Sequence, residues 1–521
     1  MTCRLAATKD KPMTRTKLSL TSSLASLALL GSLAAGCDKN QPDLEPPQDD
    51  GTAQTEPEAD PEPARVYPEP PAPTEQRPVN FPEVQKYELP NRLSVIIVEN
   101  HEVPLVDVQL VVKAGTIHGE LVAGMTASML TEGTKKRTKA KIDESIEQVG
   151  SSLSAGAGEE NAFITTRVMT PDLKLALDLV NDVVQNPKFD DEALGKLKEQ
   201  QKTAVKGEKS DGGALAQRLV SQVLYPKGHP YAQPWSSDAD IDGVTAESLR
   251  EFHKTWYRPN NAYLILSGDV TKADVEKLVE KTLGKWKPAE SFPSHPLETF
   301  KPEDYQGAVP TELTVHIVDR NQISSDIIIA NINSVARNSP EWHKMAAVTK
   351  LFGGGMSSRL FRDIREDKKL TYNINSFQSS QKAVGAFAIV TQTKEAGEML
   401  GLLFDHVERL RTSDPSETEF NATVNNMALS FPLQIETAGQ IAGKVRTMQT
   451  YGLPDDYYNT YIDDVRAITM ADIQATAAKH IHPIPVIVIV GKAMKVEKQL
   501  KDVKALEGAK IIKYNTELQP I

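Results

Sequence analysis

Histidine, cysteine and serine would carry most hydrolytic chemistry, and this sequence offers few of them in a usable arrangement. Only Cys3 and Cys37 occur among 521 residues; the first would be removed with the lipoprotein signal expected below and the second lipidated, which leaves no thiol for a zinc site or a nucleophile. The ten histidines are scattered, and no two of them stand one helical turn apart with a carboxylate between them. No serine lies in a Gly-x-Ser-x-Gly turn. The chain's own residues therefore predict no hydrolytic centre.

The remaining candidates among the histidines have ordinary explanations. His480 and His482 are close together, where a helix is expected to end before a strand, and His118, His229 and His253 occur singly. We interpret each as a surface or helix-capping residue, because a hydrolytic zinc site needs its ligands grouped on one face.

The stretch GELVAGMTASMLTEGTKKRT, residues 119–138, places small residues where larger ones would fit. Gly124, Ala127 and Ser128 have the spacing i, i+3, i+4, which brings them to one face of a helix. None of the three can ligate a metal or act as a base. The sequence therefore predicts a helix with one unoccupied face.

A second stretch, LFGGGMSSRLFRDIREDKKLTYNINS, combines three glycines with a cation and a phenol. Gly353, Gly354 and Gly355 can expose backbone amides and adopt positive φ, which would suit binding of an extended peptide or a turn before a helix. Arg365 stands seven residues before Tyr372. Both are hydrogen-bond donors, but a surface ion pair and a strand aromatic would explain them equally well.

Residues 1–37 are typical of a bacterial lipoprotein signal. Arg15 and Lys17 precede a largely apolar, serine-containing run that ends in Leu-Ala-Ala-Gly before Cys37, and Met13 is an alternative start. Small residues before a lone cysteine favour this interpretation over a transmembrane helix. We expect lipidation at Cys37 and a location in the bacterial cell envelope, anchored to a membrane and facing the periplasm. Inner and outer membranes both remain open.

Residues 38–80 are predicted to form an extended tether. The segment is rich in Pro and Glu and almost free of large aliphatic residues, so it cannot form a core. Over residues 38–78, eleven acidic and three basic side chains give −8 of the net charge of −11, which leaves the remaining chain only mildly acidic. Nothing in this charge distribution indicates binding to nucleic acid.

The rest of the chain predicts an α+β fold. Residues 93–98 and 106–112 read as strands, whereas helices from Lys141 and Pro171 show the 3.6-residue apolar period. Strands and helices are mixed without strict alternation, which favours a layered α+β arrangement over a doubly wound parallel sheet.

Two halves of the chain share an internal pattern. Thr245 and Pro259, followed by a strand and Gly268, recur at the same offset as Thr469 and Pro483, followed by a strand and a glycine. We predict two homologous domains, 81–290 and 291–521, each a mostly antiparallel sheet with helices packed on one face.

Several stretches together resemble the pitrilysin/insulinase family of zinc metallopeptidases, the inverted zincins, in its small two-domain type. They are LPNRLSVIIVENHEVPLVDVQLVVKAG, MLTEGTKKRT, PDLKLALDLVNDVVQNPKFDDE, FHKTWYRPNNAYLILSGD and the glycine-rich stretch above, in the family's order. The resemblance covers nearly everything after residue 80. It implies half of the four-domain clamshell that encloses a substrate in single-chain members.

The resemblance also identifies what is missing. Active members carry His-x-x-Glu-His, whose positions fall here on Gly124, Ala127 and Ser128. Their third ligand, a Glu, would fall near Ala204 or Val205, and a shifted alignment could use Glu199 or Glu208. No shift restores the histidines. This chain is therefore expected to bind no metal or other cofactor itself.

The resemblance assigns a role to Arg365 and Tyr372. In active relatives the matching Arg and Tyr reach the zinc site of the opposing half, where the Tyr stabilises the oxyanion and the Arg holds substrate backbone. The glycines of 353–355 would belong to the peptide-binding loop. The family's arrangement therefore implies a contribution to another subunit's active site.

Two functions from different classes follow. The first is a lipid-anchored, non-catalytic subunit that pairs with a zinc-bearing paralogous subunit and supplies half of the chamber for a peptide or unfolded protein. The alternative is an inactive peptidase-like scaffold or binding protein of the cell envelope. Neither involves nucleic acid.

Overall fold

The computed structural model describes residues 79–521, except 233, 334 and 380. Its compact body comprises Asn80–Ile521. The signal segment, the lipidation site at Cys37 and nearly all of the tether lie outside the described residues and stay predictions. Within the described part, no helix combines the length and apolarity that a membrane span requires.

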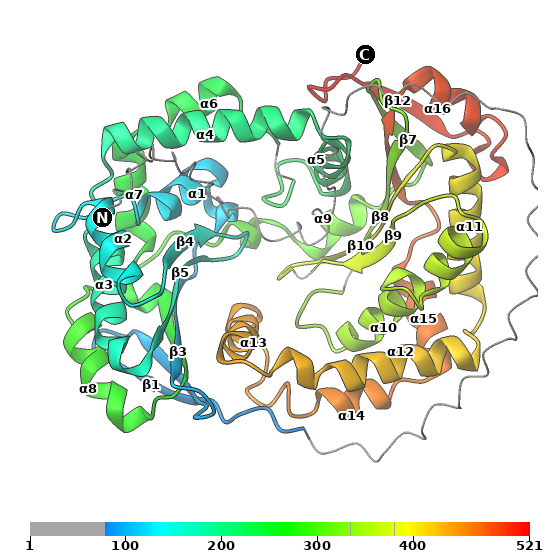
Figure 1. Ribbon diagram of the computed structural model, residues 1–521. Coiled ribbons are helices and arrows are strands. Elements are labelled where there is room, and N and C mark those ends of the chain that lie inside the picture. The colour runs from blue at the N-terminus through cyan, green and yellow to red at the C-terminus, as the bar shows by residue number, and fades with distance from the viewer. Residues whose placement is uncertain (1–78, 233, 334, 380) are drawn as a thin grey trace, which may run out of the picture. The chain divides into compact units, whose positions relative to one another are not determined.

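The first half of the body contains a six-stranded sheet with the order β1-β2-β6-β3-β5-β4 (Figure 1). All neighbours are antiparallel except β2 and β6, so the prediction of a mostly antiparallel sheet is confirmed. The outer edge of β4 has no strand partner among the described residues. The strands are β1 (Gln85–Glu88), β2 (Ser94–Glu99), β3 (Leu105–Val112), β4 (Leu153–Ala157), β5 (Ala162–Met169) and β6 (Ala262–Gly268).

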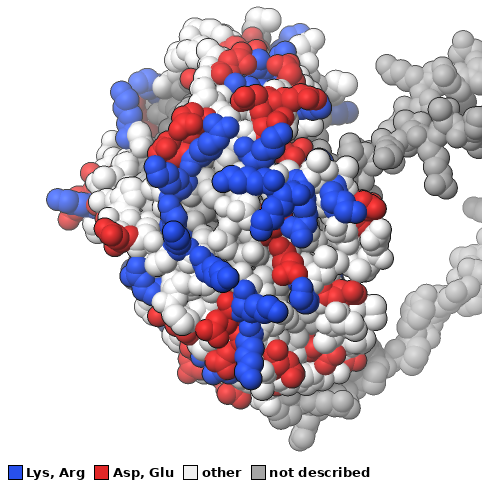
Figure 2. Space-filling view, turned by 90° about the vertical axis from the view of Figure 1, so that its left-hand side faces the viewer, with Lys and Arg blue, Asp and Glu red and all other residues white. Residues whose placement is uncertain are grey.

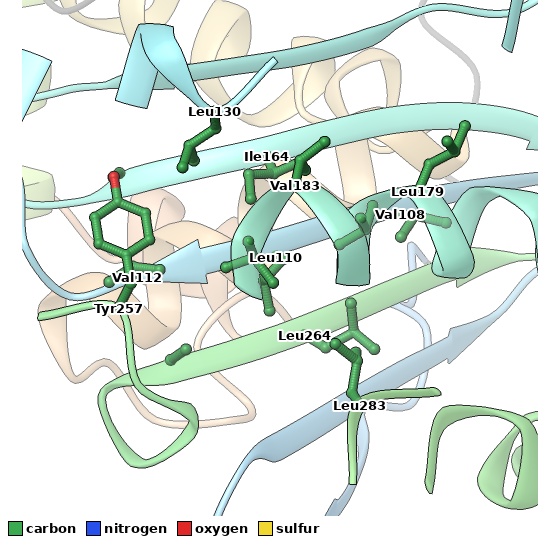
Figure 3. Close-up of a cluster of buried hydrophobic side chains, with 14 of the residues drawn as sticks. Val108, Leu110, Val112, Leu130, Ile164, Leu179, Val183, Tyr257, Leu264 and Leu283 are labelled. Carbon is green, nitrogen blue, oxygen red and sulfur yellow. The ribbon is translucent and has the colours of Figure 1, made fainter. Parts of the chain in front are cut away.

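Helices pack on this sheet through apolar faces. Figure 3 shows Leu179 of α3 beside Val108 of β3 and Val183 of α3 beside Ile164 of β5, all within one buried apolar cluster. Burying each such side chain contributes about 1.5–3 kcal/mol. The helices that follow β3 are α1 (Glu120–Met129), α2 (Lys139–Glu147), α3 (Leu173–Gln185), α4 (Asp191–Lys209), α5 (Gly212–Leu224), α6 (Asp238–Gly243), α7 (Ala246–Trp256), α8 (Lys272–Leu283) and α9 (Pro302–Gly307).

The second half contains another six-stranded sheet, with the order β12-β7-β11-β8-β10-β9. Here β7 pairs in parallel with both β11 and β12, and the other neighbours are antiparallel. The strands are β7 (Thr314–Asp319), β8 (Ser325–Asn333), β9 (Ile374–Gln378), β10 (Gly385–Thr393), β11 (Val486–Gly491) and β12 (Lys510–Tyr514). The helices are α10 (Trp342–Gly353), a π-helical segment (Phe361–Asp367), α11 (Ala396–Thr412), α12 (Glu417–Ser430), α13 (Ala438–Tyr451), α14 (Tyr461–Arg466), α15 (Met470–His480) and α16 (Ala493–Leu500).

The two halves repeat one topology. Strands β2-β6-β3-β5-β4 of the first sheet correspond in order to β7-β11-β8-β10-β9 of the second. Thr245 and Thr469, which share an offset in the sequence, both cap a helix with a reciprocal capping box, before α7 and α15 respectively. The predicted α+β class with two homologous domains is confirmed.

The halves also exchange helices, which the sequence did not predict. Helix α5 packs on β8 and β11 of the second sheet, where Leu215 and Leu219 join Val488 in one apolar cluster. Helix α13 packs on β3 and β6 of the first sheet, where the Tyr263 and Thr450 hydroxyls lie 3.3 Å apart. Each sheet therefore carries a helix from the other half in addition to its own. The boundary at residues 290 and 291 stays a prediction.

The outer helices of the first half carry mixed charge. Figure 2 views this face and shows Lys and Arg side chains lying beside Asp and Glu. Many are neighbours on one helix, such as Lys174 with Asp178 at 2.6 Å and Lys196 with Glu192 at 2.7 Å. Such exposed pairs favour solubility and contribute little stability.

A substitution at Gly268 would test the close approach of β6 to β3. Its φ is +134°, and a Cβ built on it would lie 2.0 Å from the Leu105 carbonyl oxygen. We expect Gly268→Ala to destabilise the first half by about 3 kcal/mol, which calorimetry would detect as a midpoint lower by about 6–10 °C.

The matched control is Gly124→Ala, where a Cβ would meet no atom within 4 Å. Because Gly124 lies inside helix α1, alanine there should be neutral or stabilise by up to about 1 kcal/mol. Equal midpoints for the two variants would contradict the proposed steric reason.

Candidate functional site

Helix α1 carries Gly124, Ala127 and Ser128, the three positions that the resemblance aligns with the zinc-binding motif. Gly119 precedes the helix at φ 143°, and Glu120 occupies its first turn. Gly124 and Ser128 are partly exposed, and a side chain at Gly124 would enter open space. Ala127 is fully buried in the first core. Gly124 and Ser128 therefore lie on a partly open side of α1 that begins one turn after Glu120, whereas Ala127 faces the core.

A guanidinium group lies beside this face. Arg218 of α5 donates to Glu120 of α1 (Nη1–Oε1 3.3 Å) and to Glu208 of α4 (Nη2–Oε2 2.9 Å). The indole nitrogen of Trp235 also donates to the Glu208 carboxylate, at 2.9 Å. The Arg218 side chain is only 17% exposed, so this ion-pair group is largely shielded from water.

The bridge uses two carboxylates that each lie one helical turn from a position named by the resemblance. Glu120 is one turn before Gly124, and Glu208 is one turn after Ala204. Burial raises the pKa of Glu120, Arg218 opposes that rise, and the nearby Glu208 adds to it. A guanidinium has no lone pair to offer a metal. The bridge therefore links α1 to α4 through Arg218. The Glu208 carboxylate is occupied by hydrogen bonds from Arg218 and Trp235.

The other positions named for the third ligand are also unsuitable. Ala204 is exposed and has no donor atom, and the carboxylate of Glu199 is 75% exposed and pairs with Lys202 at 3.1 Å. Across residues 79–521, apart from the three undescribed positions, no group of three or more His, Cys, Asp or Glu is arranged to hold a metal ion.

The role of Arg218 was not predicted from the sequence. The residue lies in GGALAQRLVSQ, within a helix whose apolar residues Leu215 and Leu219 are buried. One basic residue on such a helix is ordinarily read as solvent-exposed. In the sequence, only apolar residues on more than one face of α5 could have indicated that this helix is buried.

The glycines of 353–355 have specific structural reasons. A Cβ on Gly353 would lie 2.5 Å from the Ser376 backbone nitrogen, so glycine lets the end of α10 approach β9. A Cβ on Gly354 would lie 2.6 Å from Lys350 Cα, and Gly355 has φ +143°. The geometry supports the turn interpretation, and a peptide-binding role stays a prediction.

Arg365 and Tyr372 lie on a short π-helical segment and in the turn after it. The Arg365 guanidinium lies over the Phe361 ring, 4.3 Å from its centroid, and its Nε is 3.6 Å from Glu366. Tyr372 is 91% exposed. The adjacent Thr371 is anchored by donation to the carbonyl of Gln392 at 2.7 Å. A fixed backbone therefore presents the phenol to solvent, without a described contact to α1.

A buried ion pair positions the start of this segment. Arg359, 4% exposed, donates to Glu419 of α12 through Nε at 2.8 Å and Nη2 at 3.3 Å. Burial alone would raise the pKa of Glu419, but hydrogen bonds from Arg359 and Ser416 lower it to about 2. Residue-by-residue reasoning missed Arg359, which lies six residues before Arg365.

Comparison with known proteins decides the family. The model of the insulinase family (peptidase family M16) matches residues 94–227, and the model of the peptidase M16 inactive domain matches residues 243–427. The chain belongs to peptidase family M16. The resemblance found in the sequence is therefore confirmed, and the described residues form the two-domain M16 fold.

Individual M16 relatives are distant but extensive. An uncharacterized zinc protease of Streptomyces coelicolor is 21% identical over 366 residues, 70% of this chain and 79% of that protein. The non-peptidase homolog YmxG of Helicobacter pylori is 21% identical over 403 residues, 75% and 89% of the two chains. A peptidase M16 inactive domain from Pseudomonas fluorescens gives a TM-score of 0.70 at 25% identity, covering 78% of this chain and 98% of that one. This chain thus has an inactive, peptidase-like M16 scaffold.

The histidines of this M16 chain serve its packing. His253 Nε2 lies 2.8 Å from the Val184 carbonyl oxygen, and His229 Nε2 lies 2.9 Å from the Tyr305 hydroxyl. Burial lowers the pKa of both to about 4. The expectation of a surface position is wrong for His229 and His480, because their exposed fractions are only 3% and 5%.

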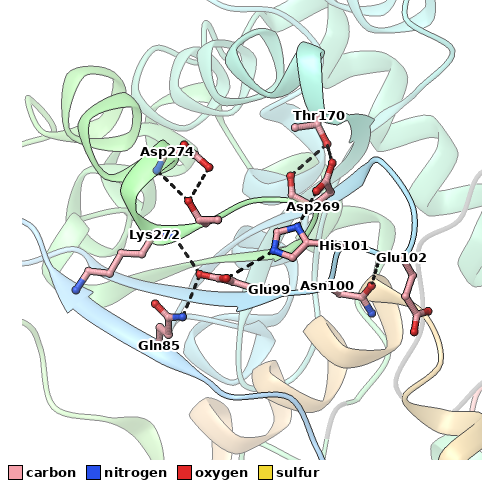
Figure 4. A network of polar contacts seen from close by, with 10 residues as sticks. Gln85, Glu99, Asn100, His101, Glu102, Thr170, Asp269, Lys272 and Asp274 are labelled. Carbon is pink, nitrogen blue, oxygen red and sulfur yellow. Dashed lines mark hydrogen bonds and ion pairs between the residues drawn. The ribbon is translucent and has the colours of Figure 1, made fainter.

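One histidine lies in a polar network at the ends of β2 and β6 (Figure 4). His101 Nδ1 is 2.7 Å from Asp269, and its Nε2 is 3.6 Å from Glu99. The bond to Asp269, and more weakly that to Glu99, raises the His101 pKa. Thr170 donates to the same Asp269 at 2.9 Å, so its hydroxyl is directed away from the histidine's nitrogens. This network is an ion-pair cluster. It does not place a nucleophile in contact with a base.

Removal of the Arg218 guanidinium tests the bridge. We expect Arg218→Met to lower the free energy of unfolding by about 2 kcal/mol, because two partly buried carboxylates lose their counter-charge. Thermal unfolding of the purified chain would measure this loss. In the Arg218→Met background, Glu120→Gln with Glu208→Gln should recover most of it. A midpoint unchanged by Arg218→Met would show that the bridge stabilises nothing.

Proposed function

We propose that this chain is the non-catalytic, lipid-anchored subunit of a two-chain M16 peptidase. The observation that carries the proposal is an asymmetry within one scaffold. The helix that would hold zinc has Gly124, Ala127 and Ser128 and lies beside the Arg218 bridge. The opposite half keeps Arg365 and presents Tyr372, 91% exposed, to solvent. Such a chain can assist another active site but has none of its own.

The chain would also supply half of a peptide-binding chamber. Helix α1 packs beside β4, whose outer edge has no partner among the described strands. An unpaired edge can receive an extended segment through main-chain hydrogen bonds, with little demand on its sequence. This supports a peptide or an unfolded protein as the substrate, and the Gly353–Gly355 turn would lie within the same chamber.

The partner would be a paralogous M16 subunit with an intact His-x-x-Glu-His helix. It would bring the zinc that polarises the attacking water, while this chain binds no metal. Tyr372 would donate to the oxyanion of the tetrahedral intermediate, and Arg365 would hold the substrate backbone. The lipid at Cys37 would keep the pair in the cell envelope on the periplasmic side, at the inner or the outer membrane.

Reconstitution tests this assignment. The purified chain alone should hydrolyse no peptide and contain no stoichiometric zinc by elemental analysis, and addition of the zinc-bearing partner should produce cleavage. Arg365→Ala with Tyr372→Phe should lower kcat of the mixture by about 100-fold, because stabilisation of the developing oxyanion is lost.

Lys368→Ala is the matched control, since Lys368 is an exposed residue between the two. Its mixture should retain the rate of the unmodified pair. A rate that survives Arg365→Ala with Tyr372→Phe would refute the proposed role. Capture of envelope complexes that never include a zinc-bearing M16 chain would favour the alternative, an inactive scaffold.

A further inference from the structure

The tips of two hairpins from the two halves meet inside the body. Residues 158–161 join β4 to β5, and the described residues 379 and 381–384 lie between β9 and β10. Gln381 Nε2 donates to Glu159 Oε2 at 3.4 Å, and Lys382 Nζ lies 3.4 Å from Glu160 Oε2. The second tip therefore holds both carboxylates of the first.

Tyrosines close this contact on the side of α5. The Tyr225 hydroxyl donates to Gln381 Oε1 at 2.7 Å, and the Tyr231 hydroxyl donates to Glu160. Tyr225 and Gln381 are buried. Because Gln381 accepts from Tyr225 and donates to Glu159, its orientation is fixed within one hydrogen-bond chain.

Other titratable groups surround the contact without balancing Glu159. Helix α13 contributes Tyr451, the segment between β3 and α1 contributes Lys113 and His118, and the segment after α8 contributes His295. Burial lowers the pKa of Lys113, His118 and His295, and the positive charge of Lys382 lowers each of them further.

Of the two adjacent carboxylates, only Glu160 forms an ion pair with a described ammonium group. Glu160, 5% exposed, takes the Lys382 ammonium and the Tyr231 hydroxyl, whereas Glu159 has a neutral amide as its side-chain partner. Burial raises the pKa of Glu159 to about 7, the Gln381 amide opposes that rise, and the Glu160 charge adds to it. Glu159 therefore changes charge near neutral pH while its neighbour keeps the cation.

We propose that Glu159 is a proton-controlled latch on the β4–β5 hairpin: protonated, it holds the tip against the second half, and ionised, it loosens the tip. The movement is confined to the hairpin, because α5 and α13 interlock the two halves. Since β4 carries the unpaired edge, the latch regulates the strand that receives peptide. Only this last consequence rests on the proposed function.

The direction of the pH effect follows from proton linkage. The latched state binds the Glu159 proton up to about pH 7, whereas a solvated glutamate binds it up to about 4.5. Latching is therefore strongest below about pH 4.5, weakens as the pH rises to about 7, and is constant above that.

Amide hydrogen exchange of the isolated full chain tests the latch. Rates between about pH 5 and 8, corrected for intrinsic exchange, should show opening of residues 153–169 that increases by up to about tenfold per pH unit and levels off near pH 7. Glu159→Gln should remove this dependence and keep the hairpin protected at pH 8. Glu199→Gln, which neutralises an exposed carboxylate of α4, should behave as the unmodified chain.

A second variant guards against a local packing defect in Glu159→Gln. Glu160→Gln removes the adjacent charge, so its opening should level off at a lower pH than in the unmodified chain. The latch is refuted if Glu159→Gln keeps the pH dependence, or if the unmodified hairpin shows none. These measurements need no second subunit, so their failure is distinguishable from failure of the two-chain proposal.

Discussion

The guanidinium of Arg218 is the charge on which the arrangement of the first half depends. It lies on α5, a helix whose apolar face is buried in the core of the second half. From there it reaches Glu120 on α1 and Glu208 on α4. The Arg218 side chain therefore connects α1 and α4 to the second half, in which the apolar face of α5 is buried. The connection is rigid because the helix that carries the charge cannot move without opening an apolar core.

Local signals in the sequence predicted the elements but not the exchange between halves. Thr245 and Thr469 revealed the repeat because a capping box involves only residues three apart. The apolar face of α5 was equally regular, but periodicity states that a face is buried and not which sheet buries it. For the same reason Arg218 could not be predicted as a bridging cation, since its partners are 98 and 10 residues away.

Some residues of the candidate site were likewise predictable from the sequence, and others were not. The small residues at Gly124, Ala127 and Ser128 were identified by resemblance, and the structure adds which of them face open space. The segment with Glu159 and Glu160 would read as an ordinary exposed turn, because two adjacent acidic residues are normally solvated. In the structure Glu160 is buried and Glu159 partly buried, and Glu159 contacts Gln381, 222 residues later, which no local pattern reports.

A bound zinc ion and a guanidinium satisfy carboxylates in different ways. Zinc accepts lone pairs and leaves a position open for water, which is the basis of hydrolysis. A guanidinium donates protons in a fixed plane and leaves no open position. Without Arg218, Glu120 and Glu208 would lie close together without a counter-charge. With Arg218 between them, both carboxylates have a counter-charge and α1 packs beside β4, where it would form a wall of the proposed chamber.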